Sequence, residues 1–449
     1  MMSLSEAAVF VRGRVSGDNV RFDGVSTDSR SVARGDLFVA LRGERFDGHD
    51  FLDAAAKHGA AAAMVDRSYH GTYPLPVAIV EDTKRGLGDL ARQWRARFTP
   101  ALVAVTGSNG KTTVKEMLAA ILRRHAGERA VLATTGNLNN DIGVPLTLLR
   151  LRVEHRWCAI ELGMNHRGEI AYLASLAAPT VAMVNNAQRE HLEFMGSVDE
   201  VAAENASVYD ALPAAGVAVV NADDEHAGYF RSRAGARRVV DFGLRGAAVS
   251  GGYALKGLSS ELRLHTPQGE ANATLAIPGL HNVRNAFAAA ACAHAAGIEL
   301  SSIAAGLTAF RPYTGRLQVK QATNGATVID DSYNANPDSV RAAIDVLASC
   351  ETPTALVLGD MGEVGPHGPD FHREIGTYAR SRGVNQLLGL GTATKHAVDA
   401  FGAGAEHFSD VDALVPAIRG RTVLVKGSRF MRMERVVAAL TGARTDGGH

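Results

Sequence analysis

The sequence predicts an α/β protein of three domains, and three observations support that prediction. The chain has 449 residues, which is more than one hydrophobic core usually serves. Short apolar runs alternate with helical patterns through most of it, which is typical of parallel strands joined by crossover helices. The pattern changes twice, so we expect a small mixed α/β domain at 1–81, a central domain at 82–312 and a C-terminal domain at 313–449.

Composition and charge exclude several classes of protein. The apolar and charged fractions, 46% and 21%, are those of a globular chain and exclude collagen, coiled coil and disorder. The 47 basic and 47 acidic side chains cancel, so no overall field would hold nucleic acid or an anionic membrane. No signal peptide and no apolar run of about 18 residues is visible, and the cysteines Cys158, Cys292 and Cys350 lie far apart. We expect a cytoplasmic monomer, with no nucleic-acid partner and no stable membrane insertion.

The first domain is expected to be small because its β-like runs are short and separated by turn signals. The runs are Leu37–Leu41, Ala61–Val65 and Val77–Val80. The turn signals between them, such as Arg34-Gly35-Asp36, are rich in glycine and charge.

The central domain opens with a helical pattern at Lys84–Phe98 and continues as apolar runs separated mostly by helical patterns. This alternation predicts a parallel sheet. The runs are Ala101–Val105, Ala130–Ala133, Cys158–Ile160, Val181–Val184 and Val217–Val220. Polarity then alternates with period two at Glu261–His265, which predicts a small antiparallel patch on this domain.

The C-terminal domain alternates again and is predicted to be Rossmann-like and doubly wound. Its expected strands are Thr327–Ile329, Ala355–Leu358, Gln386–Leu390 and Thr422–Val425, and its expected helices are Ser339–Ala348, Phe371–Arg382 and Arg432–Leu440. The run Gly389–Thr394 resembles an incomplete dinucleotide fingerprint, which we interpret as a tight strand–helix turn. Ligands of such sheets bind beyond the carboxyl ends of the strands.

The strongest functional signal is Ala104–Thr113, where an expected strand runs into a glycine-containing turn and then a helix near Lys111. Such a loop turns backbone N–H groups around phosphate oxygens. Lys111 would neutralise the β- and γ-phosphates, and the Thr112 hydroxyl would bind Mg²⁺. Val105 stands where the general pattern has glycine, so this is a variant phosphate loop. The expected phosphate-binding residues are Gly107, Ser108, Asn109, Gly110, Lys111, Thr112 and Thr113.

Two further residues follow expected strands and could ligate the divalent ion. Glu161 comes just after the run Cys158–Ile160, and His191 lies beyond the run Val181–Val184. A surface-cap role for Glu161 and a structural role for His191 are the alternatives. The amide-rich segment 134–145 would offer a hydrogen-bonding surface or serve as an ordinary polar loop.

The segments TGSNGKTT, ELGMN, NNAQREHLE and HNVRN together resemble the Mur ligases, and the likeness covers essentially the whole chain. The resemblance implies the three-domain fold of that family, with a central P-loop ATPase domain, and an ATP-dependent, amide-forming activity in peptidoglycan synthesis. The implied cofactors are ATP and Mg²⁺. The segments GNLNND, DDSYNANP and LGDMGEVG further imply UDP-N-acetylmuramoyl-tripeptide and D-alanyl-D-alanine as the substrates.

The resemblance also implies roles for individual residues. Lys111, Arg316 and His191 would be catalytic, with Arg316 reaching the γ-phosphate. Asn282 and Asn285 would contact adenine, and Asp331 would be a carboxylate on the ribose or the phosphate side of ATP. Thr112, Glu161 and His191 would hold metal. The expected substrate-binding residues are Ser29, Arg30, Asn137, Asn140, Asn334, Asn336 and Ser428.

One position departs from the family pattern. Many members carry a carbamylated lysine near a second metal, and Asn205 stands at that position here. Its neighbour Glu204 is no simple substitute, because adjacent residues of a helix point about 100° apart. We predict that lysine carbamylation is not needed.

Two other functions stay open at the level of the sequence. One is another Mur-type or folylpolyglutamate-type ligase, and the other is a P-loop NTPase that uses hydrolysis for motion or signalling. The sequence identifies no general base. The segment Arg311–Gly315 is expected to be a hinge on which the C-terminal domain closes.

Overall fold

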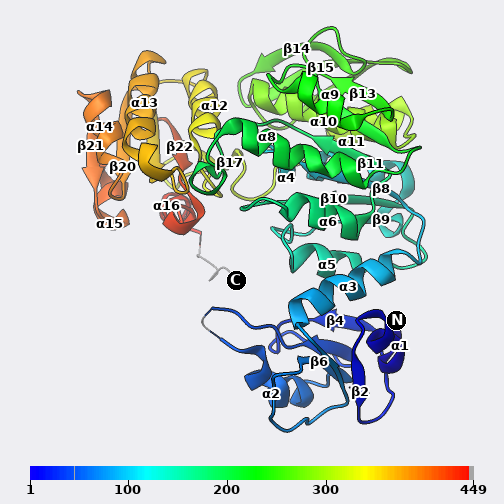
Figure 1. Cartoon of the computed structure of the whole chain (residues 1–449). Helices are drawn as coiled ribbons and strands as arrows, with labels where there is room; N and C mark the ends of the chain where they lie inside the picture. Colours follow the sequence, from blue (N-terminus) through cyan, green and yellow to red (C-terminus); the bar gives the residue numbers. More distant parts are fainter. Residues whose placement is uncertain (45, 444–449) are drawn as a thin grey trace.

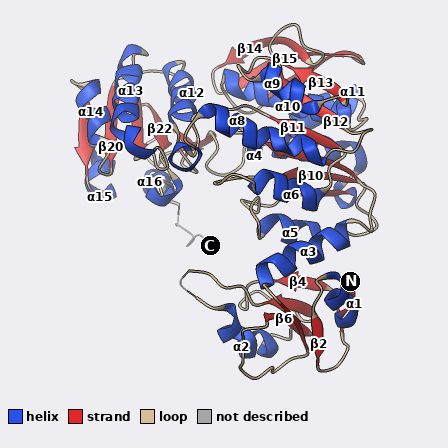
Figure 2. Cartoon of the chain, in the orientation of Figure 1, coloured by secondary structure: helices blue, strands red, loops and turns tan. Residues whose placement is uncertain are grey.

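The computed structural model describes residues 1–44 and 46–443, and Figure 1 shows it as three lobes. The N-terminal lobe lies below the central lobe in that view, and the C-terminal lobe lies beside the central one. Residue 45 of the predicted first domain and residues 444–449 of the predicted third domain lie outside the described residues. Helices and parallel strands alternate in each lobe, which confirms the predicted α/β fold class (Figure 2).

The N-terminal lobe holds a five-stranded sheet of order β2-β7-β6-β5-β4, in which only β2 runs antiparallel to its neighbour. The strands are β2 (Arg14–Ser16), β4 (Gly24–Ser26), β5 (Asp36–Val39), β6 (Ala62–Asp66) and β7 (Val77–Val80). β1 (Met2–Ser3) and β3 (Arg21–Phe22) form a separate antiparallel pair, and the helices are α1 (Leu4–Phe10) and α2 (Leu52–Lys57). The run expected at Leu37–Leu41 begins and ends earlier, as β5.

The helix α3 (Thr83–Arg95) joins this lobe to the central one and corresponds to the pattern predicted at Lys84–Phe98. It begins where the Asp82 side chain accepts a hydrogen bond from Arg85 N at 2.7 Å. Its buried residues recur every three or four positions and contact α5 (Gly143–Leu148) and α6 (Glu169–Ala177).

The central sheet is parallel throughout, with the order β13-β12-β11-β8-β10-β9. Its strands are β8 (Ala101–Thr106), β9 (Val131–Ala133), β10 (Trp157–Glu161), β11 (Val181–Val184), β12 (Val217–Asn221) and β13 (Arg238–Phe242). The first five match the predicted apolar runs to within two residues at either end, whereas β13, with an exposed start, was not predicted.

The two faces of β8 serve two different cores. Val103 and Val105 pack in the cluster that contains α4 (Lys111–Ala126) and α10 (Leu280–Ala295). Leu102 and Ala104 pack on the opposite side with α3 and α6. The strand is therefore apolar from Ala101 to Val105, as is typical of a parallel strand buried on both faces, and its carboxyl end at Thr106 leads directly into the phosphate loop.

Further helices of the central lobe are α7 (Leu192–Met195), α8 (Val198–Ala206), α9 (Ala227–Ala234) and α11 (Leu300–Ala309). The predicted antiparallel patch is a three-stranded sheet of β14 (Ser250–Lys256), β15 (Ser259–Thr266) and β16 (Gly269–Leu275). β15 alternates strictly between exposed and buried residues from Ser260 onward, which is the period-two signal read from Glu261–His265.

The C-terminal sheet has the order β17-β18-β22-β19-β20-β21. Its strands are β17 (Gln318–Gln321), β18 (Thr327–Asp331), β19 (Thr354–Gly359), β20 (Gln386–Leu390), β21 (Ala405–Phe408) and β22 (Thr422–Lys426). The helices are α12 (Pro337–Ala348), α13 (Gly368–Ser381), α14 (Lys395–Phe401), α15 (Val411–Leu414) and α16 (Glu434–Thr441). The parallel, doubly wound prediction is confirmed for five strands, and the polar edge strand β17 adds one antiparallel pairing.

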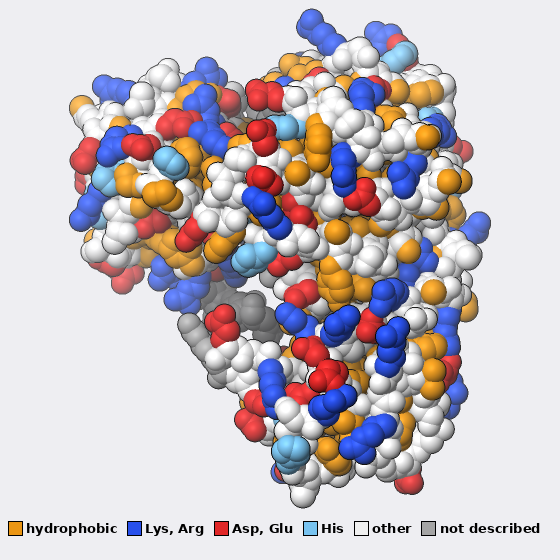
Figure 3. Space-filling view, in the orientation of Figure 1, with side chains coloured by type: hydrophobic (Ala, Val, Ile, Leu, Met, Phe, Trp, Pro, Cys, Tyr) orange, Lys and Arg blue, Asp and Glu red, His pale blue; other side chains and the backbone are white. Residues whose placement is uncertain are grey.

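Charged side chains of both signs are interspersed over the face shown in Figure 3, as expected for a chain whose formal net charge is zero. Within residues 1–44 and 46–443, no helix combines the length and the apolar character that a membrane crossing requires.

Candidate active site

The phosphate loop connects β8 to α4, and two of its glycines have backbones that other residues rarely adopt. Gly107 has φ 127° and Gly110 has φ 84°. A Cβ at Gly107 would lie against the backbone of Asn185, and one at Gly110 against the side chain of Asn285. The loop can therefore wrap tightly around an anion only with glycine at these two positions. No acidic residue lies in the first turn of α4, which leaves its positive N-terminus open to phosphate.

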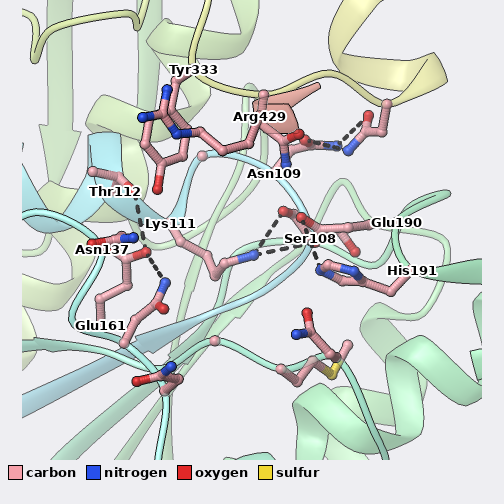
Figure 4. Close-up of a pocket in the computed structure, with 18 of the residues that line it drawn as sticks. Ser108, Asn109, Lys111, Thr112, Asn137, Glu161, Glu190, His191, Tyr333 and Arg429 are labelled. Atoms are coloured by element: carbon pink, nitrogen blue, oxygen red, sulfur yellow. Dashed lines mark hydrogen bonds and ion pairs between the residues drawn. The ribbon is translucent and has the colours of Figure 1, made fainter. Parts of the chain in front are cut away.

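The Lys111 ammonium lies within this loop, as Figure 4 shows. Its Nζ donates to the carbonyl oxygens of Gly107 at 2.6 Å and Ser108 at 3.0 Å. It also donates to Glu190 Oε2 at 3.2 Å. Both charged side chains are nearly buried, with 14% and 11% of their surfaces exposed, so a single counter-ion balances the lysine inside the cavity.

Glu161 ends β10 beside the loop and is buried, with 1% of its surface exposed. Its Oε1 accepts hydrogen bonds from Thr112 Oγ1 at 3.1 Å and Asn139 Nδ2 at 2.8 Å (Figure 4). Its Oε2 has no hydrogen-bond partner among the residues that the structure describes. A buried carboxylate oxygen without a donor is a natural ligand for a cation, so the residues present fit the Mg²⁺ that the phosphate loop implies.

Arg316 reaches the phosphate loop from the start of the C-terminal lobe. Its Nη2 donates to Thr112 Oγ1 at 3.3 Å, and its guanidinium stacks over the Tyr333 ring at 4.2 Å from the centroid. Its Nε is buried and has no partner within the described part of the chain. Arg316 and Glu161 line the same cavity, each with one polar atom that has no hydrogen-bond partner among the described residues, which suits a ligand that carries both an anion and a cation.

Two adjoining cavities meet at this point. The first, of about 450 Å³, is lined by residues that include Ser108, Lys111, Thr112, Asn137, Asn140, Glu161, His191, Arg316, Asn334 and Asn336. The second, of about 290 Å³, is lined by residues that include Asn109, Gly110, Thr113, Asn282, Asn285, Arg316, Asp331 and Lys426. Most of the predicted ATP-binding, catalytic and metal residues therefore lie around one continuous site between the central and C-terminal lobes.

The second cavity is lined by amides and by one buried ion pair. Asn285 Oδ1 accepts from Asn185 Nδ2 at 3.0 Å, and Asn285 Nδ2 donates to Asn282 Oδ1 at 3.1 Å. Asp331 Oδ2 accepts from Lys426 Nζ at 2.5 Å. Burial raises the pKa of Asp331, and the attraction of Lys426 partly offsets that rise.

His281 lies at the base of α10 in the same cavity. Burial, reinforced by the nearby positive charges of Lys426 and Arg284, lowers the pKa of His281 to about 4. The imidazole is therefore neutral near pH 7. Its Nε2 lies 3.1 Å from Asn282 Nδ2, so it can accept a hydrogen bond from that amide.

His191 stands between the lobes, at a backbone position with φ 53°. Its Nδ1 lies 2.6 Å from Glu363 Oε2 of the C-terminal lobe, and its Nε2 lies 3.6 Å from Glu190 Oε1. The contact with His191 lowers the pKa of the Glu363 carboxyl more than burial raises it. Within the described residues, no group of three or more His, Cys, Asp or Glu side chains is arranged to hold a metal.

The predicted substrate-binding residues do not all lie together. Some line the first cavity, and others lie in the C-terminal or the N-terminal lobe. Asn137, Asn140, Asn334 and Asn336 line the first cavity. Ser428 is buried, donates to Ala335 O at 3.0 Å and accepts from Gly362 N at 2.8 Å, so its hydroxyl is used within the C-terminal lobe. Ser29 and Arg30 lie in the N-terminal lobe and line neither of the two cavities among the described residues, and Arg30 is paired with Asp28 at 2.7 Å.

Asn205, at the family's lysine position, is fully buried. Its Oδ1 accepts from Thr106 Oγ1 at 2.7 Å, and its Nδ2 donates to Val201 O at 3.0 Å. Glu204 accepts from Gly168 N and Ile170 N, both at 2.8 Å, and so caps the start of α6. Both side chains are engaged in the scaffold, and neither lines the first cavity.

The glycine-containing turn 389–394 of the C-terminal lobe holds an anion that the chain itself supplies. The Asp360 carboxylate accepts from Thr392 N at 2.8 Å and from Ala393 N and Thr394 N at 2.9 Å each. The backbone donors that would hold a phosphate in a dinucleotide fold are thus occupied. This geometry supports the interpretation of the segment as a strand–helix turn.

The sequence analysis did not single out several residues that the structure places at the site. Glu190 pairs with Lys111, Arg189 pairs with the C-terminal lobe, and Tyr333 stacks on Arg316. The sequence does offer a signal for Glu190 and Arg189. It is the polar run of four residues, Gln188 to His191, that lies between an apolar strand and a helix.

The fold and the site define a phosphate-loop protein whose two adjoining cavities lie between two α/β lobes. The chain belongs to the Mur ligase family, which confirms the resemblance read from its motifs. Three family profiles match in order along it: the Mur ligase family catalytic domain at 21–95, the Mur ligase middle domain at 105–293 and the Mur ligase glutamate ligase domain at 315–429.

Individual relatives agree with this assignment. The chain is 41% identical to the UDP-N-acetylmuramoyl-tripeptide–D-alanyl-D-alanine ligase of Escherichia coli (strain K12), over 98% of each chain. It is 40% identical to the ligase of the same name from Haemophilus influenzae, again over 98% of each chain. Among solved structures, MurF from Acinetobacter baumannii is 34% identical, with a TM-score of 0.90 over 98% of each chain. MurF from Thermotoga maritima in complex with ADP is 26% identical, with a TM-score of 0.82 over 94% of this chain and 97% of that one.

Proposed function

We propose that this enzyme joins D-alanyl-D-alanine to UDP-N-acetylmuramoyl-tripeptide at the expense of ATP, giving the pentapeptide precursor of peptidoglycan. The observation that carries the proposal is the meeting of Arg316 with Thr112 at 3.3 Å, beside the Lys111 loop. This contact supports a phosphate position that is surrounded by positive charge from both the central and the C-terminal lobe. The full-length similarity to ligases of that name supports the choice of substrates.

Joining a carboxylate to an amine in water is unfavourable, so the carboxylate needs activation. The γ-phosphoryl group of ATP passes to the terminal carboxylate of the tripeptide, which gives an acyl phosphate and ADP. Lys111, the Gly107–Thr113 loop and Arg316 hold the phosphate chain and offset its charge. Asn282, Asn285 and Asp331 would hold the base and sugar of ATP in the second cavity.

Bound Mg²⁺ would supply further neutralisation of phosphate charge, and Thr112 and Glu161 are the residues placed to hold it, with His191 as a more distant candidate. Glu161 Oε2, which has no hydrogen-bond partner among the described residues, is the atom that we expect to bind the ion. The remaining steps of the proposed reaction take place between the acyl phosphate and the dipeptide.

The amine of D-alanyl-D-alanine then attacks the acyl carbon, an amide forms, and phosphate leaves. The amine of pKa ~8 is mostly protonated at neutral pH, so it must lose a proton before it attacks. Departing phosphate can accept that proton. Asn334 and Asn336 line the cavity from the C-terminal lobe, where they are placed to orient the dipeptide.

The proposal extends to the organisation of the chain. Residues 1–81 bind the UDP-sugar end of the tripeptide substrate through Ser29 and Arg30, residues 82–312 bind ATP, and residues 313–449 bind the dipeptide, with Asn137 and Asn140 of the central domain and Ser428 of the C-terminal domain contributing to the substrate site. The enzyme acts as a cytoplasmic monomer without nucleic-acid partners.

A phosphate-release assay tests this function. ATP, Mg²⁺, UDP-N-acetylmuramoyl-tripeptide and D-alanyl-D-alanine are supplied together and then with each one omitted. We expect phosphate release only in the complete mixture, with one amide product formed for each phosphate. Phosphate release without either acceptor would instead identify a P-loop NTPase.

A further inference from the structure

The four residues that precede α7 contact two different partners in turn. Gln188 and Glu190 contact the phosphate loop, whereas Arg189 and His191 contact the C-terminal lobe. This segment, Gln188 to His191, is called here the coupling segment. It is the part of the central lobe that touches both the phosphate site and the C-terminal lobe through consecutive side chains.

The contacts of the coupling segment with the phosphate loop are close and polar. Gln188 N donates to Ser108 Oγ at 2.9 Å, and Asn109 Nδ2 donates to Gln188 Oε1 at 2.7 Å. Glu190 accepts from Lys111 Nζ at 3.2 Å. The position of the coupling segment therefore fixes three residues of the loop that would hold the nucleotide.

Arg189 makes the strongest contact with the C-terminal lobe. Its Nη2 donates to Asp338 Oδ1 at 2.6 Å and its Nη1 to Glu374 Oε2 at 2.8 Å. Its backbone N–H also donates to Asp338 Oδ2 at 2.9 Å. One guanidinium thus joins the first turn of α12 to α13, in the forked geometry that lysine cannot reproduce.

The environment of Arg189 strengthens these bonds. Between 23% and 31% of each of the three side-chain surfaces is exposed, so water screens the pairs less than it screens a surface ion pair. The hydrogen bonds from Arg189 lower the pKa of the Glu374 carboxyl more than burial raises it. The guanidinium also lies over the Phe371 ring, 5.3 Å from its centroid.

Asp338 lies two residues after Asn336, which caps α12 and pairs with Asn109 of the phosphate loop. Asn336 Nδ2 donates to Asn109 Oδ1 at 2.9 Å, and Asn109 Nδ2 donates back to Asn336 Oδ1 at 3.3 Å. When Arg189 holds α12 in place, Asn336 therefore makes a second contact with the phosphate loop. The phosphate loop is held on one side by the coupling segment and on the other by the start of α12.

We propose that Arg189 is a positioning residue that couples the seating of the C-terminal lobe to the geometry of the phosphate loop. Nucleotide then binds well only when α12 is docked on Arg189. The inference rests on the proposed ATP site, but it does not depend on which acid and amine are joined.

The test uses Arg189→Met in the full chain, with Mg²⁺-ADP as the probe. We expect ADP affinity, measured by titration calorimetry, to fall about tenfold, and hydrogen exchange of the peptide containing residues 107–111 to speed up. In turnover assays the KM for ATP should rise, while the KM for the UDP-linked substrate stays unchanged. Arg189→Lys, which keeps the charge without the fork, should lie between wild type and Arg189→Met.

Arg341 provides the matched control. It donates to the same Glu374 at 3.1 Å but lies on α12 and stacks on Tyr378, so it joins nothing across the lobes. Arg341→Met should leave ADP affinity and exchange at 107–111 as in wild type. Asp338→Asn alone should reproduce part of the loss, and the double variant Arg189→Met, Asp338→Asn should lose no more than Arg189→Met.

Two results would overturn the inference. One is wild-type ADP affinity and wild-type exchange at 107–111 in Arg189→Met. The other is an equal loss of ADP affinity in Arg341→Met. That result would indicate that Glu374, the carboxylate that both arginines contact, matters only for the stability of the C-terminal lobe. Failure of the ligase assay with tight, Arg189-dependent ADP binding would reject the proposed substrates and leave the coupling intact.

Discussion

Lys111 is the residue on which the proposed ATP site depends most directly. Its ammonium group is bound by two loop carbonyls and the Glu190 carboxylate, at the start of a helix with no acidic residue in its first turn. These three oxygen atoms hold Nζ of Lys111 at the position where the phosphate chain of ATP would lie in the proposed complex.

Lys111→Ala should therefore abolish ATP-dependent turnover, with a loss of about a hundredfold or more, because the charge that offsets the developing phosphate charge is removed. Steady-state phosphate release measures it. Lys256→Ala, on the exposed strand β14, is the control and should behave as wild type. Activity of more than a few per cent in Lys111→Ala would move the phosphate site elsewhere.

A second prediction at the scale of single residues concerns Asn205. Its side chain is an amide and offers no amine for carbon dioxide to modify, and that amide is already hydrogen-bonded to Thr106 and Val201. Activity should be the same in buffers stripped of bicarbonate and in buffers supplied with it. A collapse of turnover on stripping, reversed by adding bicarbonate, would contradict this expectation.

His281 is expected to titrate far from the ordinary histidine range. NMR of the folded protein should show its midpoint near pH 4 and not near 6.5, with His281→Gln used to assign the signal. Because the unfolded chain takes up this proton near 6.5 and the folded chain only near 4, stability contributed by the neutral ring is present above 6.5 and decreases as the pH falls through that window. A midpoint at 6.5 would show that the ring is well hydrated.

At the scale of elements, sequence patterns predicted most strands and helices because parallel strands that are buried on both faces form continuous apolar runs, as Ala101–Val105 of β8 does. Elements with mixed burial, such as β13 and the edge strand β17, carry no such pattern and were missed. Glu161 was predictable because it directly follows a buried strand. The partnership of Arg189 with Asp338 was not, since the two are 149 positions apart and the motif NNAQREHLE, which contains Arg189, does not indicate its partner.

The start of α14 provides a prediction about an element. Replacing Asp360 by Ala leaves three backbone N–H groups without their carboxylate, which costs about 1–2 kcal/mol of local stability. Hydrogen exchange at Thr392, Ala393 and Thr394 should accelerate about tenfold. Asp399→Ala, on the exposed side of the same helix, is the control. Unchanged exchange in Asp360→Ala would mean that the turn holds its shape without the carboxylate.

At the scale of the whole molecule, the site lies between the central and C-terminal lobes, and neither of these two completes it alone. Arg316 enters it from beyond the segment Arg311–Gly315, and the apolar cluster of the central lobe continues into the C-terminal lobe at Ile344 and Leu347 of α12. The N-terminal lobe is set apart from this contact in Figure 1. A UDP-linked substrate would bridge it to the phosphate site.

Small-angle scattering should therefore show a smaller radius of gyration when ADP and UDP-N-acetylmuramoyl-tripeptide are both present, because closing the lobes excludes water from a labile acyl phosphate. Lys111→Ala with the same additions is the control and should remain more extended. A wild-type scattering curve that does not change on addition of both ligands would count against closure.

The pairing of Lys111 with Glu190 has a consequence for how strongly an anion can bind. An anion that reaches the Lys111 ammonium competes with a carboxylate that belongs to the chain itself. Binding there is therefore an exchange of one negative partner for another, and part of the attraction between the lysine and the anion is spent on displacing Glu190.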